Sequence, residues 1–289
     1  MLNNAIGVIL FVLVFNLGGC ISSERALIEA TQNGDLKQVQ KLISKGADVN
    51  ARDDDGQSSL HHACYLGNFE IVKSLVTNGA NVNIEVPKFA LTPLHGATMN
   101  GDIKTVKFLI EHNAKLNAKD IKGGTPIFAA CWIGKLSVVK YLVEKGAEID
   151  ITTNDGATVL HYASQSGNLD LVKFLTSKGL DVNSQADNGA TPLHIAVSIG
   201  SMDVVEYLLA NGAKINIKMN HDFAFNRCIR APILSDNDIE EIQIYIDQTP
   251  LDIAGDMGFI EISRLLEEKI PSKTDEPITE PEPPSPGFG

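Results

Sequence analysis

The stretch TPLHGATMNG at residues 92–101 decides the fold, because its first four residues return at a nearly constant interval. Related tetrapeptides begin before it at Ser58 and after it at Thr125, Thr158 and Thr191. A fixed period of about 33 residues is the sequence signature of a repeat protein, in which each unit packs only against its neighbours. The sequence is therefore interpreted one unit at a time.

Each unit carries the signals of two short helices. Threonine is a good N-cap and the following proline fits the first helical turn, so a helix is expected to begin at Pro93 and at its equivalents. Glycines with the same interval should end the helices in a left-handed conformation, and Asn113, in one glycine position, is the next best residue for it. These glycines are Gly34, Gly67, Gly101, Gly134, Gly167 and Gly200, and Gly46, Gly79, Gly146, Gly179 and Gly212. Turn-rich segments such as 50–56 connect the units.

A unit of this length, with two helices and TPLH at the head of the first, resembles the ankyrin repeat. The resemblance covers residues 24–270 and implies an all-α solenoid of about seven helix-turn-helix repeats joined by hairpin-like connecting loops. The first unit lacks TPLH and the last ends on charged residues, so both resemble the polar end caps that a stack requires. The repeats are expected at about 24–53, 54–86, 87–120, 121–153, 154–186, 187–219 and 245–270.

Two segments depart from the period. The connection at 85–91 has one extra residue and no Asp-Gly pair, so the tip of this hairpin should differ in shape from the others. The last two heads, at Thr191 and Thr249, are much farther apart than the others, which leaves an insertion at 219–244. Around 238–246 the sequence fits either a short helix or a strand, because isoleucines recur there at both spacings.

The N-terminus carries a targeting signal. The apolar run at residues 5–15 is too short to span a bilayer as a helix. The sequence LGGC that follows it resembles the lipobox of bacterial lipoproteins, which implies a signal peptide at 1–19, a lipid on Cys20 and a lipidated linker at 20–23. No Lys or Arg precedes the apolar run, so a short uncleaved anchor or a wrongly chosen start stays open as an alternative.

Composition limits the classes of partner. The formal net charge of −12 disfavours nucleic acid, whose recognition depends on Lys and Arg at the phosphates, so the expected partner is another protein. Half of the 12 prolines fall within 271–289 together with acidic residues, which predicts a disordered, solvated tail. We expect the protein to be a monomer.

No catalytic or metal-binding constellation is evident, and no cofactor is expected. Four histidines share one position of the unit, so they are spread along the stack and cannot meet at one metal. They are His61, His95, His161 and His194, and the resemblance to ankyrin repeats implies that they form structural hydrogen bonds. Cys64 and Cys131 are expected in the core. The insertion holds His221 and Cys228, whose types suit an enzyme or metal site but whose spacing matches none.

The only tryptophan, Trp132, lies outside the apolar stripe of its helix, in which Ile127, Ala130 and Cys131 face the second helices. In the ankyrin family the two residues before the first glycine line the concave surface, which contacts partners together with the hairpin tips. Apolar and aromatic residues at these positions are concentrated in repeats two to four, and such clusters usually mark an interface. The predicted partner-binding residues are Tyr65, Leu66, Phe89, Met99, Ile121, Trp132 and Ile133. In the alternative interpretation Trp132 packs on a neighbouring repeat. Acidic residues 53–55 beside the cluster either steer a basic partner or are only solvated, as charged tips usually are.

The sequence therefore predicts a non-enzymatic protein-protein interaction scaffold. It would be anchored by lipid in a bacterial cell envelope and would bind another protein through the concave surface of repeats two to four. Two alternatives stay open: a secreted effector that acts on a host protein, and a small enzyme or metal site in the insertion.

Overall fold

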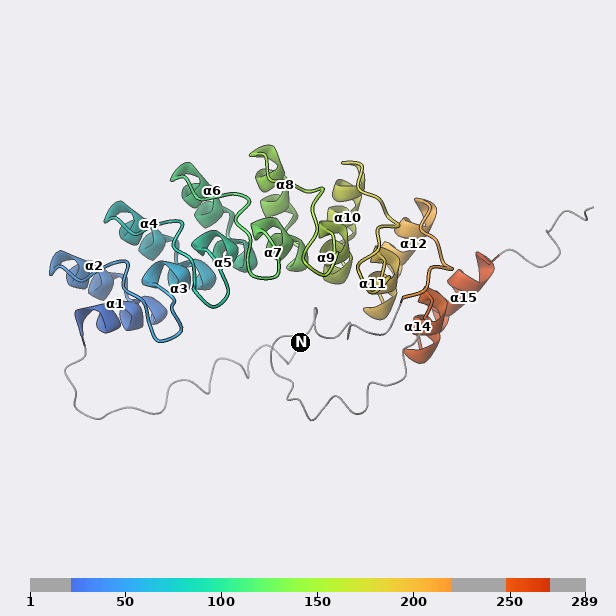
Figure 1. Cartoon of the computed structure of the whole chain (residues 1–289), viewed down its shortest axis with the longest axis horizontal. Helices are drawn as coiled ribbons and strands as arrows, with labels where there is room; N and C mark the ends of the chain where they lie inside the picture. Colours follow the sequence, from blue (N-terminus) through green and yellow to red (C-terminus); the bar gives the residue numbers. More distant parts are fainter. Residues whose placement is uncertain (1–21, 220–247, 271–289) are drawn as a thin grey trace, which may run out of the picture.

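The computed structural model describes residues 22–219 and 248–270 as a row of helix pairs. Consecutive pairs stack side by side along a curved row, with the first helix of each pair on the inner side and the second on the outer side (Figure 1). The helices of these two segments are α1 (Ser23–Gln32), α2 (Leu36–Ser44), α3 (Ser59–Leu66), α4 (Phe69–Thr77), α5 (Pro93–Asn100), α6 (Ile103–Glu111), α7 (Pro126–Trp132), α8 (Leu136–Glu144), α9 (Val159–Ser166), α10 (Leu169–Thr176), α11 (Pro192–Ser198), α12 (Met202–Ala210), α14 (Pro250–Asp256) and α15 (Ile260–Glu268). The predicted all-α solenoid is confirmed.

The helices begin and end where the repeated residues predict. Thr92 has an extended backbone and α5 starts at Pro93 directly after it. Gly101 ends the same helix with a φ of 83°. Asn113 follows α6 with a φ of 65°, so it does take the left-handed conformation expected of a glycine substitute. Within residues 22–219 and 248–270, no helix is long and apolar enough to cross a membrane.

Four of the first helices carry a histidine that links two repeats. In α5 the Thr92 N–H donates to His95 Nδ1 at 3.1 Å. The ring proton therefore lies on Nε2, which donates to the Gly124 carbonyl of the next repeat at 3.4 Å. The same link runs from His61 to Leu91, from His161 to Ala190 and from His194 to Gln248. The structural role predicted for these histidines is confirmed.

A row of asparagines at the bases of the hairpins provides a second link. Asn83 donates from Nδ2 to the Asn113 carbonyl at 2.9 Å and accepts from the Lys115 N–H at 2.7 Å, which ties repeat two to repeat three. Equivalent links from Asn50 and Asn183 join repeats one to two and five to six. Asn117 also accepts a backbone N–H of the next repeat, from Glu148, but donates to the Glu148 carboxylate, and this link joins repeats three and four. Repeat four has Asp150 at this position.

The core lies between the two rows of helices. Leu60, Leu94 and Leu160, one residue before the linking histidines, are fully buried. Cys64 and Cys131 are also buried, as predicted, and burial raises the pKa of both thiols. They are core residues and not reactive groups, because a nucleophilic cysteine needs a lowered pKa and some exposure.

The hairpin at 85–91 differs from its neighbours as predicted. In the regular hairpins an N–H bonds to the carbonyl four residues later, for example Asp53 to Gln57 at 2.8 Å. Here the Val86 N–H bonds to the Leu91 carbonyl, five residues later, at 2.9 Å. The extra residue is accommodated by Ala90, which has a φ of 54° although it is not glycine.

Several predictions lie outside the described residues. These are the signal peptide at 1–19, the lipid on Cys20, residues 220–247 with His221 and Cys228, and the tail at 271–289. At the edges of residues 220–247 the Met219 N–H donates to the Gln248 carbonyl at 3.0 Å. This contact brings repeats six and seven together despite the long interval between their heads.

Candidate functional site

The ends of three inner helices form the candidate site. The residues of the site lie one or two positions before the glycine that ends each helix, beyond the stripe that faces the core. Tyr65 and Leu66 are 57% and 45% exposed, and Ile133 is 38% exposed. Met99 and Trp132 are half-buried. We call this set the inner patch: Tyr65 and Leu66 on α3, Met99 on α5, Trp132 on α7 and Ile133 directly after it.

Hydrogen bonds hold neighbouring parts of the inner patch in place. Asn100, at the end of α5, donates from Nδ2 to the Tyr65 carbonyl at the end of α3, at 3.1 Å. Gly67 ends α3 with a φ of 74°, and its missing Cβ leaves room for the Asn100 side chain, whose Oδ1 would lie 2.7 Å from such a Cβ. On the other side Asn168 donates to the Gly134 carbonyl at 2.9 Å. The inner patch is therefore a preformed surface rather than a set of separate helix ends.

Two hairpin tips add apolar residues beside this row of repeats. Phe89 and Ile121 are 42% and 55% exposed. They are neighbours in space because the Ile121 N–H donates to the Phe89 carbonyl at 3.1 Å. Lys88 places its ammonium 5.2 Å from the centre of the Phe89 ring. We call Phe89 and Ile121 the rim pair.

The apolar character is interrupted at repeat five. Repeat five has Gln165 and Ser166 at the positions of Trp132 and Ile133, and both are half-buried. Repeat six has Ser198 and Ile199 there, also half-buried. Position within the repeat alone therefore does not create the exposed apolar cluster, and the local sequence of repeats two to four does.

Asp53, the first acidic residue of the turn before α3, has a structural role. Its Oδ2 lies 2.7 Å from His62 Nε2, at hydrogen-bond or ion-pair distance. Its other oxygen accepts the backbone N–H groups of Asp55 and Gln57 at 3.0 and 2.8 Å. Asp54 and Asp55 are exposed. The Asp53 carboxylate is thus occupied within the turn.

The linking histidines have structural roles in the described part of the chain. The linking histidines use both ring nitrogens in hydrogen bonds, and burial lowers the pKa of His61, His161 and His194 to about 4, so they are neutral at pH 7. Residues 22–219 and 248–270 contain no group of three or more His, Cys, Asp or Glu side chains that could hold a metal ion. The insertion residues His221 and Cys228 are outside these segments.

Sequence reasoning missed a row of aromatic residues on the outer helices. Each occupies the same position of its helix, and each is half-buried against the core. They are Phe108, Tyr141, Phe174 and Tyr207. Their constant interval is the signal that reveals them, and it equals the interval of the heads.

This stack of helix pairs, with nearest-neighbour contacts and a repeated head, defines a helical repeat protein. The sequence model of the family described as Ankyrin repeats (3 copies) matches residues 27–120, 85–153 and 127–219. The chain belongs to the ankyrin-repeat family. Ankyrin repeats are protein-protein interaction modules, and the fold is generally a non-enzymatic binding scaffold.

Curated relatives share only the repeats. The chain is 39% identical over 103 residues to Delta-latroinsectotoxin-Lt1a of Latrodectus tredecimguttatus, which covers 34% of this chain and 8% of the toxin. It is 32% identical over 100 residues to Putative ankyrin repeat protein L371 of Acanthamoeba polyphaga mimivirus, covering 35% and 13%. It is 31% identical over 106 residues to human SMC5-SMC6 complex localization factor protein 1, covering 36% and 10%. The matches thus span a small part of each relative's length.

Proposed function

We propose that this protein is a lipid-anchored binding module of a bacterial cell envelope, and that the inner patch holds a partner protein. The observation that carries the proposal is the exposure of Tyr65, Leu66 and Ile133 beside the half-buried Trp132. Contiguous apolar and aromatic side chains on a rigid surface are characteristic of protein interfaces. Because the helix ends are already held together, little conformational entropy is lost when the partner binds.

The anchor rests on the leader and the lipobox-like LGGC at residues 17–20. Cys20 lies only three residues before α1 begins at Ser23, so a lipid there would hold the first repeat close to the membrane. More than one acyl chain on this cysteine would give stable attachment, whereas one chain binds a membrane only marginally. The inner patch would then be presented at the membrane surface.

Replacing Trp132 by alanine tests the binding surface. We expect binding to weaken by about 2 to 4 kcal/mol, because aromatic residues near the centre of an interface dominate its energy. The measurement is quantitative capture from envelope extract with residues 21–289. The matched control is Gln165→Ala, at the same position of repeat five, which should capture the partner as well as the unaltered protein does. Equal capture by Trp132→Ala, or a strong fall in its melting temperature, would make Trp132 a packing residue instead.

Cys20→Ser tests the anchor. The full chain is expressed in bacteria with a labelled fatty acid, and we expect the unaltered protein to take up the label and to sediment with membranes. The variant should lose both properties. An unaltered protein that takes up no label and accumulates in the medium would contradict the anchor and support the secreted effector.

A further inference from the structure

Neighbouring outer helices are separated by grooves, which aromatic side chains fill in a regular way. The aromatic ring of one outer helix packs against the preceding outer helix, where a lysine side chain covers the ring. Lys107 on α6 lies 5.3 Å from the ring centre of Tyr141 on α8. Equivalent contacts join Lys140 to Phe174 at 5.6 Å and Lys173 to Tyr207 at 5.8 Å. Phe108 meets Phe69 of α4 edge to face at 5.7 Å. Each groove from α4 to α12 therefore contains a ring.

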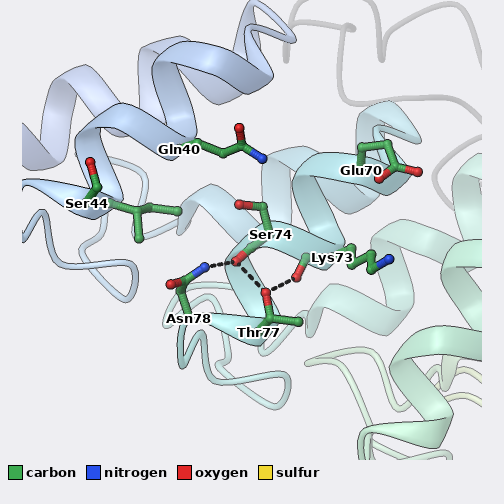
Figure 2. Close-up of a pocket in the computed structure, with 8 residues that line it drawn as sticks. Gln40, Ser44, Glu70, Lys73, Ser74, Thr77 and Asn78 are labelled. Atoms are coloured by element: carbon green, nitrogen blue, oxygen red, sulfur yellow. Dashed lines mark hydrogen bonds between the residues drawn. The ribbon is translucent and has the colours of Figure 1, made fainter.

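The groove between α2 and α4 has no ring of its own. Ser74 occupies the position of Phe108, because the two residues are separated by the same interval as the heads at Ser58 and Thr92. A pocket of about 420 Å³ lies here between the two helices (Figure 2). It is lined by Gln40, Ile43 and Ser44 of α2 and by Glu70, Lys73, Ser74, Thr77 and Asn78 at and after α4. A small side chain where repeats three to six have a ring explains why the pocket is open.

The lining favours a neutral ring that carries a hydroxyl group. Gln40 stands where later repeats have the covering lysine, so an amide replaces a cation. Glu70 and Lys73 carry opposite charges, which gives no net attraction to an anion or a cation. Ile43 supplies an apolar wall. The side chains of Gln40 and Ser74 face the same pocket and form no hydrogen bond with any residue in 22–219 or 248–270, so both can bond to a ligand (Figure 2).

The other hydroxyl and amide groups of the pocket are already fixed. Thr77 Oγ1 donates to the Lys73 carbonyl at 2.8 Å, and Asn78 Nδ2 donates to the Ser74 carbonyl at 2.7 Å. Ser44 donates to the Lys41 carbonyl at 2.9 Å. The chain itself contains a precedent for a phenol in such a groove, since the Tyr207 hydroxyl lies 2.6 Å from Thr176 Oγ1 of the preceding outer helix.

We propose that the groove between α2 and α4 is a binding pocket for a tyrosine side chain of a partner protein. The ring fills the space that Phe108, Tyr141, Phe174 and Tyr207 fill in the later grooves. Its hydroxyl bonds to the Gln40 amide. This site is on the outer helices, whereas the inner patch is on the inner helices, so the two surfaces can act independently (Figure 1).

The test uses the full chain and N-acetyl-L-tyrosinamide as the probe. Backbone amide signals of α2 and α4 are followed by NMR during a titration. We expect saturable shifts with a dissociation constant of about 1 mM, the range typical of a ligand this small. N-acetyl-L-phenylalaninamide should bind several-fold more weakly, and N-acetyl-L-leucinamide should cause no saturable shift. No saturable shift with the tyrosine probe would overturn the proposal.

Ser74→Tyr is the decisive variant, because it fills the groove with a ring of the chain's own, as Tyr141 and Tyr207 do. It should abolish binding of the probe without lowering the melting temperature. The matched control, Ser137→Tyr, adds the same side chain at an exposed position of α8 and should leave binding unchanged. Probe binding that persists in Ser74→Tyr would overturn the proposal.

Gln40→Leu provides a second test that does not depend on filling the groove. It removes the free amide from an outer helix and keeps the side chain's size. It should weaken binding of the tyrosine probe several-fold and leave the weaker phenylalanine probe unaffected. Equal effects on both probes would contradict the assigned hydroxyl contact.

Discussion

The junction between repeats four and five differs from the junctions on either side of it. Between repeats two and three, three and four, and five and six, a histidine of the first helix and an asparagine at the hairpin base both cross to the next repeat. Between repeats four and five neither link exists, because Phe128 and Asp150 occupy the two positions. One fold therefore tolerates two ways of joining neighbours.

The exceptional junction has an aromatic contact in place of the histidine link, while Asn154 and Asn168 still donate across it to the Ile121 and Gly134 carbonyls. The ring of Phe128 meets that of Tyr162 edge to face at 5.2 Å. The Ala157 carbonyl accepts the Thr153 N–H at 3.0 Å, as the equivalent hairpin carbonyls do, and the Thr153 hydroxyl lies 3.2 Å from it where a linking histidine would donate. The exchange leaves Thr125 Oγ1 buried without a hydrogen-bond partner in the described protein, and this is one of three such side-chain atoms there.

The other two unpaired atoms lie in repeat five, at Ser164 Oγ and Gln165 Oε1. Unpaired buried polar atoms are uncommon, and all those found in the described residues belong to repeats four and five. In a solenoid, stability is approximately a sum of repeat terms and nearest-neighbour terms, so the loss of the histidine and asparagine links should lower the nearest-neighbour term of this junction.

Acidification should affect the regular junctions most. The pKa of His61, His161 and His194 is lowered to about 4 by burial, from a usual value of 6.5. The unfolded chain therefore binds more protons between these values, so stability is complete above pH 6.5 and is lost as the pH falls toward 4. Between pH 7 and pH 5 each histidine should cost about 1 to 2 kcal/mol, and urea unfolding at the two pH values measures the sum.

Hydrogen exchange locates this loss. At pH 5, after correction for intrinsic exchange rates, protection should fall in α3, α9 and α11 more than in α7, which has no linking histidine. A uniform fall along the stack would contradict the assignment of the pH effect to these residues.

His161→Phe copies the head of repeat four into repeat five. The Thr158 N–H, which donates to His161 Nδ1 at 3.1 Å, would lose its acceptor, and the contact to the Ala190 carbonyl would also be lost. We expect the free energy of unfolding at pH 7 to fall by about 2 kcal/mol, as for other buried groups left without a partner. At pH 5 the cost should shrink, because the variant has one fewer histidine to keep neutral. A cost that does not depend on pH would contradict this account.

Phe128→His is the reverse exchange. A histidine here would offer Nδ1 to Thr125, as His95 does to Thr92, and Nε2 to the Ala157 carbonyl. The new bonds should outweigh the lost contact with Tyr162 by about 1 kcal/mol at pH 7. At pH 5 the sign should reverse, because another buried histidine must stay neutral. Thermal melting at both pH values provides the measurement, and destabilisation at pH 7 would mean that the ring contact is the stronger of the two.

The sequence was sufficient for most of the fold because the repeated residues act locally. Thr92, Pro93 and Gly101 determine helix ends through backbone geometry alone, and their interval reveals the stack without knowledge of distant contacts. The exposure of Tyr65 and Ile133 also followed from their places on the helices. Whether they bind a partner stays a prediction.

What the sequence analysis did not supply depends on contacts between repeats. Met99 and Trp132 are only half-buried, and this depends on how neighbouring helix ends lie. The groove beside Ser74 is distinctive because the neighbouring grooves contain an aromatic ring, so it is found only when the outer helices are compared with one another. The sequence shows that Phe128 stands where other repeats have a linking histidine. The contact of its ring with Tyr162 is seen only in the structure.

Asp150→Asn has the smallest expected effect and isolates the second link. A carboxylate cannot donate to the carbonyl of Gly179, the residue that corresponds to Gly79 and Gly212, which accept from Asn50 and Asn183. An asparagine can donate to the Gly179 carbonyl and accept from the Asp181 N–H. The substitution also removes one of two acidic side chains at the base of this hairpin. We expect about 0.5 to 1 kcal/mol of added stability, the usual net value for a partly exposed hydrogen-bonded pair. The matched control is Asp187→Asn, an exposed acid of the next hairpin, which should change stability by less than the variant does. The gain should add to that of Phe128→His if the two links act independently across the junction, and a shortfall would mean that the junction opens and closes as one unit.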